Sequence, residues 1–229
     1  GEDTRAQPAM VQVTGQDVAR MGPQQRRALG LHFVPEERLG RGAVPTMGLA
    51  HNLLLTRSDA VGAMGWLHLG QLKEQARAII ERFGVKAGGA DAPARSLSGG
   101  NLQKFIVGRE IAAQPKLIII AQPTWGVDVG AAAQIHAEIL ALRDAGCAVL
   151  IVSEELDELF ELSDRLYVLA KGHLSPSVAR ADATVQQVGE WMSGLWNADV
   201  QQHLADMEQV LPSSEAAQAN ALVKGPQHV

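Results

Sequence analysis

A serine, two glycines and an asparagine follow one another at residues 98–101, and these residue types in this order can bind a phosphate group. Ser98 can cap a helix, and Gly99 and Gly100 would leave the backbone N–H groups of its first turn open to a ligand. The helix dipole adds partial positive charge, and Asn101 adds an amide donor. On these four residues alone, an ordinary serine N-cap behind a Gly-Gly turn is the better explanation.

The residues around this stretch carry further motifs in an ordered series. Residues 97–104, LSGGNLQK, resemble the signature motif of ATP-binding cassette (ABC) proteins, in the form seen in sugar and nucleoside importers. Four other stretches resemble motifs of the same family over residues 1–194: the Q-loop region (33–38 and 52–53), the end of Walker B with the D-loop (122–130), the switch region (151–158), and the strand and turn behind it (163–166 and 171–172).

The same resemblance exposes departures from the family pattern. The phosphate loop, G-x-x-x-x-G-K-[ST], does not occur in the sequence, and we expect the chain to begin just after it. Ala121 stands at the Walker B aspartate position and Gln122 at the catalytic glutamate position. Glu154 replaces the switch histidine and Glu36 the Q-loop glutamine. All four changes remove function from the domain's own nucleotide site, so we expect no catalytic residue and no metal ligand in this chain.

One subgroup of the family is similar in these respects: the fused, two-domain ATPases of nucleoside and simple-sugar importers, in their second domain. The sequence carries that subgroup's AQPTxGxDVG and VSEELDE stretches, with Trp125 where Arg is usual. The resemblance implies the energy-coupling subunit of an importer, a transport ATPase as part of the full complex. It implies a peripheral location on the cytoplasmic face of the membrane, against a transmembrane permease and, indirectly, an extracytoplasmic substrate-binding protein.

ABC domains dimerise head to tail, so the resemblance implies a role in trans for the signature. We expect the signature residues to contact the γ-phosphate of ATP on another ABC domain, which would also hold most of the contacts to Mg²⁺. Asp128 would lie at the dimer interface, and the isolated chain would neither bind nor hydrolyse ATP. The residues expected to bind or support that nucleotide are Ser98, Gly99, Gly100, Asn101, Gln103 and Lys104.

Composition narrows the class of protein independently. Across 229 residues the net charge is −5, which argues against a nucleic-acid partner because phosphate-backbone binders are usually basic. Cys147 is the single cysteine, so no internal disulfide is possible, and its apolar surroundings predict a buried core residue. Four histidines have no metal-ligand spacing, and we expect structural roles for them: His32, His51, His68 and His136.

Apolar patterning predicts an α/β fold of the P-loop NTPase type, with a mostly parallel sheet. Unbroken apolar runs at 117–121 and 147–152 are typical of strands buried on both faces, and a helical pattern at 131–142 lies between them. Further strands are expected at 10–14, 31–34 and 166–170, and helices at 23–27, 71–83, 156–162 and 184–192. A helical subdomain is expected at about 40–95, and a C-terminal helix and mobile tail at 195–229.

Two other interpretations stay open at this level. A non-transport ABC ATPase is possible, although the LSGGNLQK form and the net acidity speak against it. A truncated, inactive fragment is also possible, because a cassette without its phosphate loop and the following helix would expose apolar surface.

Overall fold

The computed structural model describes residues 6–57, 62–63 and 66–196. The chain divides into two compact units, residues 1–162 and residues 163–229. The expected domain boundary at residue 194 remains a prediction. The expected C-terminal helix and tail also remain a prediction, because residues 197–229 lie outside the described residues.

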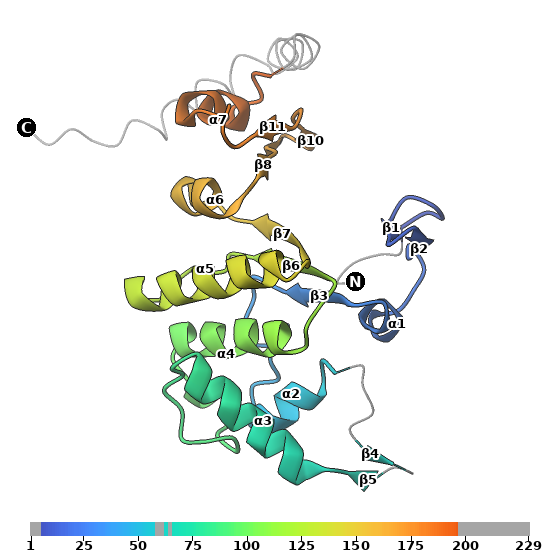
Figure 1. The fold of residues 1–229 in the computed structure, drawn as a ribbon, viewed down its shortest axis with the longest axis vertical. Coiled ribbons are helices and arrows are strands. Elements are labelled where there is room, and N and C mark those ends of the chain that lie inside the picture. Colours follow the sequence, from blue (N-terminus) through green and yellow to red (C-terminus); the bar gives the residue numbers. More distant parts are fainter. Residues whose placement is uncertain (1–5, 58–61, 64–65, 197–229) are drawn as a thin grey trace, which may run out of the picture. The chain divides into compact units, whose positions relative to one another are not determined.

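A three-stranded parallel sheet organises the first unit (Figure 1). Its strands are β3 (Leu31–Val34), β6 (Leu117–Ala121) and β7 (Ala148–Val152), in the order β3-β6-β7. The register places Leu31 opposite Leu117 and Leu117 opposite Ala148. The three strands are short apolar runs in a parallel sheet, and the predicted α/β class is confirmed. The expected burial on both faces is wrong for β7, an edge strand, whose residues alternate between exposed and half-buried, with Leu150 and Val152 on the exposed face.

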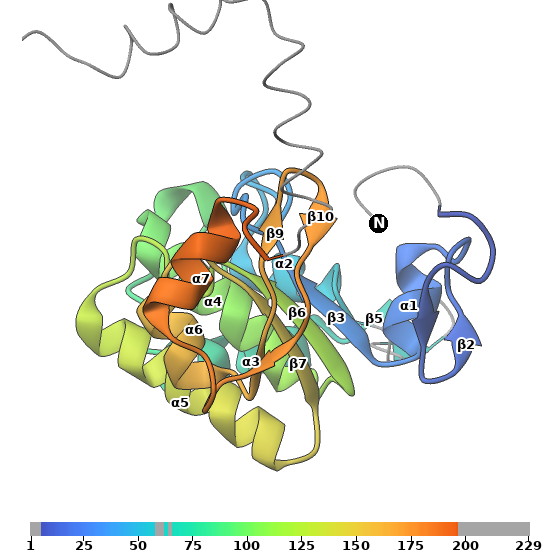
Figure 2. The same cartoon turned by 90° about the horizontal axis from the view of Figure 1, so that it is seen from above.

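Two long helices, α4 (Gly99–Ala112) and α5 (Val129–Asp144), pack beside the sheet, and α4 also contacts α3 (Leu69–Arg82). α3 in turn contacts α2 (Leu49–Leu54), so α4 lies between the sheet and this helical pair (Figures 1 and 2). The crossing of α3 and α4 is close: a Cβ built on Gly108 would lie 2.6 Å from the Phe83 ring. The largest fully buried apolar side chains of this core are Phe83, Phe105, Leu49, Leu72, Leu102, Ile106, Ile118, Ile120, Ile135 and Ile139.

Short elements complete the first unit. They are β1 (Gln12–Val13), β2 (Gln16–Asp17), α1 (Pro23–Ala28), β4 (Gly62–Ala63), β5 (Trp66–Leu67), η1 (Ala94–Ser96) and α6 (Leu156–Leu162). The strand expected at 10–14 is reduced to two residues, because Thr14 and Gly15 both have positive φ and turn the chain into β2. The segment expected to be helical at about 40–95 contains α2 and α3 but also the β4–β5 hairpin.

The second unit is a small antiparallel arrangement followed by a helix. β8 (Arg165–Leu166) pairs with β11 (Val178–Ala179), and β9 (Leu169–Ala170) pairs with β10 (His173–Leu174). The prediction of one strand at 166–170 is therefore wrong. The Val168 N–H donates to the Ser175 hydroxyl at 2.8 Å instead of to a carbonyl, which interrupts the ladder. α7 (Val185–Met192) begins behind Thr184, whose hydroxyl accepts a hydrogen bond from the Gln187 N–H.

A buried ionic cluster joins three elements of the first unit. Glu110 on α4 has no exposed side-chain surface, and it pairs with Arg109 and with Arg27 on α1, both at 2.8 Å. His32 Nδ1 on β3 lies 2.8 Å from Glu110 Oε2. Burial alone would raise the pKa of Glu110, but Arg109, His32 and Arg27 outweigh it and lower the pKa to about 2. The cluster therefore holds an ionised carboxylate inside the core.

Candidate functional site

The four departures from the family pattern lie at one edge of the sheet. Ala121 ends β6, and Gln122 follows it; Glu36 comes two residues after β3, and Glu154 two residues after β7. Because all three strands are parallel, their carboxyl ends meet at the same edge, where open α/β sheets bind ligands. The backbone continues the sheet here, since the Gln122 N–H donates to the Val152 carbonyl at 2.8 Å.

This edge is poor in groups that could hold Mg²⁺ or activate water. The methyl group of Ala121 offers no ligand, and the amide of Gln122 cannot accept a proton at neutral pH. Glu36 and Glu154 are exposed carboxylates. Among the described residues, no group of three or more His, Cys, Asp or Glu side chains is arranged to hold a metal ion. Ala121 and Gln122 therefore do not supply the carboxylates that would hold Mg²⁺ at the end of β6.

The serine–glycine stretch begins α4, and Ser98 caps it. The Ser98 hydroxyl accepts hydrogen bonds from the Asn101 side-chain amide at 2.8 Å and from the Asn101 N–H at 3.4 Å. Ser98 and Gly99 are exposed. The ordinary N-cap explanation thus describes the local geometry correctly, and it leaves an exposed helix start that an anion can approach.

Two side chains of the first turn of α4 fasten it to the end of α3. Asn101 Oδ1 accepts a hydrogen bond from the Lys86 N–H at 2.8 Å, and Lys104 Nζ donates to the Gly84 carbonyl at 2.7 Å. Gly84 directly follows α3, so the Lys104 ammonium sits at a helix C-terminus, where a cation is favoured. Both residues therefore fix the position of the helix start.

Gln103 fastens the same helix start to the turn behind β6. Its side chain is 1% exposed, and its Nε2 donates to the carbonyls of Gln122 and Pro123, both at 3.0 Å. Further along this turn, Asp128 caps α5 by accepting a hydrogen bond from the Ala131 N–H at 2.9 Å. That hydrogen bond lowers the pKa of Asp128 from its usual value. The signature residues and the Asp128 turn are thus held side by side.

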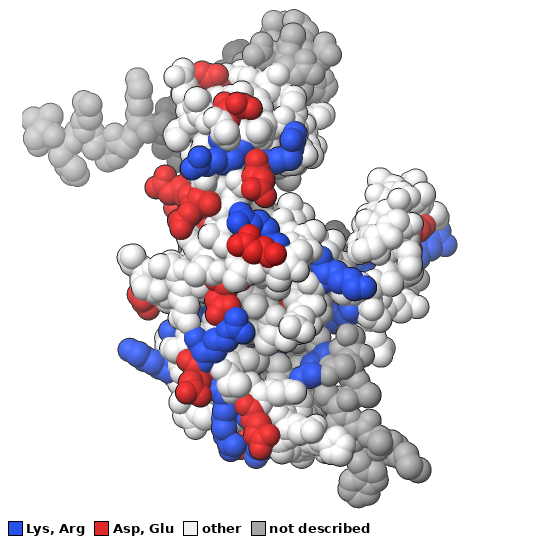
Figure 3. Space-filling model, in the orientation of Figure 1, with Lys and Arg blue, Asp and Glu red and all other residues white. Residues whose placement is uncertain are grey.

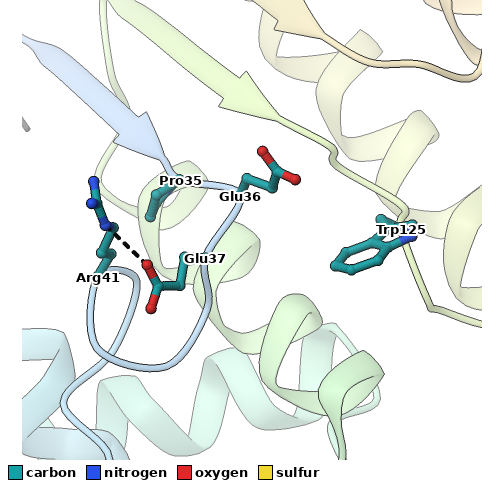
Figure 4. A pocket seen from close by; sticks show the side chains of 5 residues that line it. All are labelled: Pro35, Glu36, Glu37, Arg41 and Trp125. Carbon is teal, nitrogen blue, oxygen red and sulfur yellow. Dashed lines mark ion pairs between the residues drawn. The ribbon is translucent and has the colours of Figure 1, made fainter. Parts of the chain in front are cut away.

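Two features of the site escaped the sequence analysis. Arg38, in the loop behind β3, reaches the turn behind β6 and lies over the Trp125 ring, 5.3 Å from its centroid. Pro35, Glu36, Glu37, Arg41 and Trp125 line an open hollow of about 390 Å³, with Trp125 facing the loop from across it (Figure 4). The stretch FVPEER was visible in the sequence, but nothing in it indicates that Arg38 points toward Trp125, 87 residues away.

A second missed feature connects the switch region to the same turn. Glu158 on α6 is buried, accepts a hydrogen bond from the Thr124 hydroxyl at 2.6 Å, and lies 3.0 Å from His136 Nε2 on α5. His136 Nδ1 lies 3.1 Å from Glu161. The structural role expected for His136 fits this geometry, and the network ties Thr124 to α5 and α6.

Charge is mixed over the face of the molecule drawn in Figure 3. Among the described residues on that face, acidic and basic side chains are interspersed, and no broad area of one sign stands out. No helix within the described ranges is long and apolar enough to cross a membrane.

The fold is that of an ATP-binding cassette. A solved ATP-binding cassette in a dimeric post-hydrolysis state with ADP and Pi matches with a TM-score of 0.60, over 73% of this chain and 72% of that one, at 18% identity. A nucleotide-free cassette from an ABC transporter matches with a TM-score of 0.58, over 81% of this chain and 72% of that one, at 22% identity. At these identities the likeness establishes the fold alone.

Sequence relatives narrow the class. The guanosine import ATP-binding protein of Bacillus subtilis is 38% identical over 186 residues, which are 80% of this chain and 36% of the relative. The glucose import ATP-binding protein of Haloferax volcanii is 39% identical over 186 residues, 80% of this chain and 34% of the relative. The ribose import ATP-binding protein of Rhizobium meliloti is 34% identical over 166 residues, 72% of this chain and 32% of the relative.

Over most of its length the chain is thus similar to parts of sugar and nucleoside import ATP-binding proteins, and it has the fold of an ATP-binding cassette. It spans about a third of the length of these relatives. No protein-family model matches the sequence.

Proposed function

We propose that this chain is part of the ATP-binding component of an importer for a nucleoside or simple sugar, and that it supplies a signature motif to ATP held on a partner ABC domain. The relatives that match four-fifths of it are import ATP-binding proteins for guanosine and glucose. The chain is then one part of a transport ATPase, and hydrolysis takes place at the partner's site.

The observation that carries this proposal is an asymmetry within the first unit. One end of α4 offers exposed Ser98 and Gly99 at a helix N-terminus, a suitable place for a phosphate group. The sheet edge has Ala121 and Gln122 where this family needs acids. A domain with an exposed signature and no acid at these two positions is suited to serve a nucleotide bound on another domain.

The parts of the chain have separate roles in this proposal. Ser98, Gly99 and Gly100 face the γ-phosphate, Asn101, Gln103 and Lys104 hold that turn in place, and Asp128 lies against the partner domain. Mg²⁺, which would neutralise charge on the transferred phosphoryl group, is held mainly by the partner domain.

The remaining partners follow from the class of transporter. The cassette part of the chain is residues 1–194, and its helical part, about 40–95, faces a transmembrane permease. The protein sits peripherally on the cytoplasmic side of the membrane and receives substrate indirectly, through an extracytoplasmic binding protein. The net charge of −5 favours protein partners over nucleic acid.

The test is Ser98→Arg in the complete transporter. The new side chain would project from the start of α4 into the space that the γ-phosphate needs, so we expect ATP turnover to be abolished. Ala112→Arg, at the exposed far end of the same helix, is the matched control and should leave turnover unchanged. Wild-type turnover in the Ser98 variant would refute the proposal.

A second measurement addresses the chain's own sheet edge. We expect isothermal titration of the isolated chain with Mg²⁺–ATP to give no heat of binding. Micromolar affinity would contradict the assignment of this edge as degenerate.

A further inference from the structure

Arg38 joins three segments that come from distant parts of the sequence. Its own segment is the loop behind β3, where the Ala43 N–H donates to the Arg38 carbonyl at 2.7 Å and fixes the backbone. Its Nε donates to Gln103 Oε1 on α4 at 3.0 Å, and its Nη2 donates to the backbone carbonyl of Trp125. A single guanidinium therefore bonds the loop behind β3, the first turns of α4 and the turn behind β6.

The packing around the guanidinium leaves little freedom. A Cβ built on Gly99 would lie 2.7 Å from Arg38 Nη1, so a larger residue there would displace the guanidinium. A Cβ on Gly100 would lie 2.9 Å from the Gly126 backbone carbonyl, which cannot move aside as easily, whereas one on Gly126 would make only an ordinary van der Waals contact with the guanidinium, at 3.6 Å. Two glycines of the signature thus adjoin this contact.

Gln103 connects Arg38 to the turn behind β6 through two sets of hydrogen bonds. Its carbonyl oxygen accepts from Arg38, while its amide nitrogen donates to the carbonyls behind β6. Losing Arg38 would leave the oxygen of a side chain that is 1% exposed without this donor, and such a loss is costly in a buried place. The Trp125 ring, itself 59% exposed, covers the guanidinium from one side.

We propose that Arg38 is a positioning residue that holds the signature turn of α4 in register with the turn behind β6, so that a partner's nucleotide meets both as one surface. This proposal rests on the trans role proposed above. Because the guanidinium presents several donors in a fixed plane, a lysine ammonium at the same place cannot replace it. Arg38 touches no nucleotide and acts through Gln103 and Trp125.

The test compares Arg38→Met and Arg38→Lys with Arg143→Met in the complete transporter. Arg143 lies in the last turn of α5, is exposed and pairs with the exposed Asp144 at 2.7 Å, so its variant is the control for the loss of a guanidinium outside the site. We expect both Arg38 variants to lower kcat by roughly tenfold or more with the KM for ATP nearly unchanged, since a misplaced group costs rate more than binding. The melting temperature should fall modestly, because the buried Gln103 oxygen loses its donor. The control should behave as wild type.

Amide hydrogen exchange on the same proteins tests the register directly. We expect the N–H groups of Leu102 and Val127, one in each joined segment, to exchange severalfold faster in Arg38→Met than in Arg143→Met. Unchanged exchange, or unchanged kcat, in both Arg38 variants overturns the proposal, as does full rescue by lysine.

Ser98→Arg in the same series separates the two proposals. If it abolishes turnover while the Arg38 variants match wild type, the trans role stands and the role of Arg38 is wrong. If it leaves turnover intact, the trans role fails, and the exchange rates still decide whether Arg38 joins the two turns.

Discussion

Glu110→Gln should destabilise the chain more than any surface substitution of the same kind. The wild-type carboxylate is fully buried, and its pKa of about 2 lies below the ordinary 4.5 because three basic side chains surround it. At about 1.4 kcal/mol per pH unit, that difference corresponds to about 3 kcal/mol of native-state stabilisation of the charged form. Losing one partner of a buried ion pair typically costs about 3–5 kcal/mol, which agrees with this figure.

The direction of the pH dependence follows from the sign of the shift. Because the folded-state pKa of Glu110 is depressed, its contribution is complete above about pH 4.5 and is lost as the pH falls toward 2. Glutamine imitates the protonated acid, and it leaves the Arg109 guanidinium buried without its counter-charge. The stability difference between wild type and Glu110→Gln should therefore be about 3 kcal/mol at pH 7 and should shrink on acidification.

Urea unfolding followed by far-ultraviolet circular dichroism, at pH 7 and at several values down to pH 3, measures this difference. Glu37→Gln is the control, since Glu37 pairs with Arg41 at 2.9 Å with both side chains exposed, and such surface pairs contribute less than about 1 kcal/mol. Two results would refute the reasoning: equal losses in the two variants at pH 7, or a Glu110 loss that does not narrow as the pH is lowered.

Two further substitutions test the packing that positions the site. Gly108→Ala should destabilise the chain by about 1–3 kcal/mol, because its methyl group would meet the Phe83 ring at 2.6 Å where α3 crosses α4. Urea unfolding measures this loss, and an unchanged free energy of unfolding would contradict the close crossing. Glu158→Ala should cost about 1–3 kcal/mol by leaving the Thr124 hydroxyl without its acceptor, whereas Glu161→Ala, with a largely exposed side chain, should cost much less in the same assay.

The class of fold could be predicted from the sequence, because the length and apolar spacing of single helices and strands depend on neighbouring residues only. The run at 117–121 has the length and β-branched content of a strand, and the residues at 131–142 have the apolar spacing of a helix, so β6 and α5 lie where expected. Ser98 and Thr184 capped helices for the same local reason, since a hydroxyl can satisfy an N–H two or three residues away. The ends of strands were harder to predict, because the break at Val168 depends on the hydroxyl of Ser175, which follows β10.

The sequence by itself determined which chemistry the chain carries: a serine–glycine helix start at 98–101, and no acid at residues 121 and 122. These facts depend only on residue type and on spacing along the chain. The tertiary structure alone decided what stands beside that helix start. Arg38, Gln103 and Trp125 are far apart in sequence, and they meet because parallel strands bring their carboxyl ends to one edge, from which the following loops reach the start of α4.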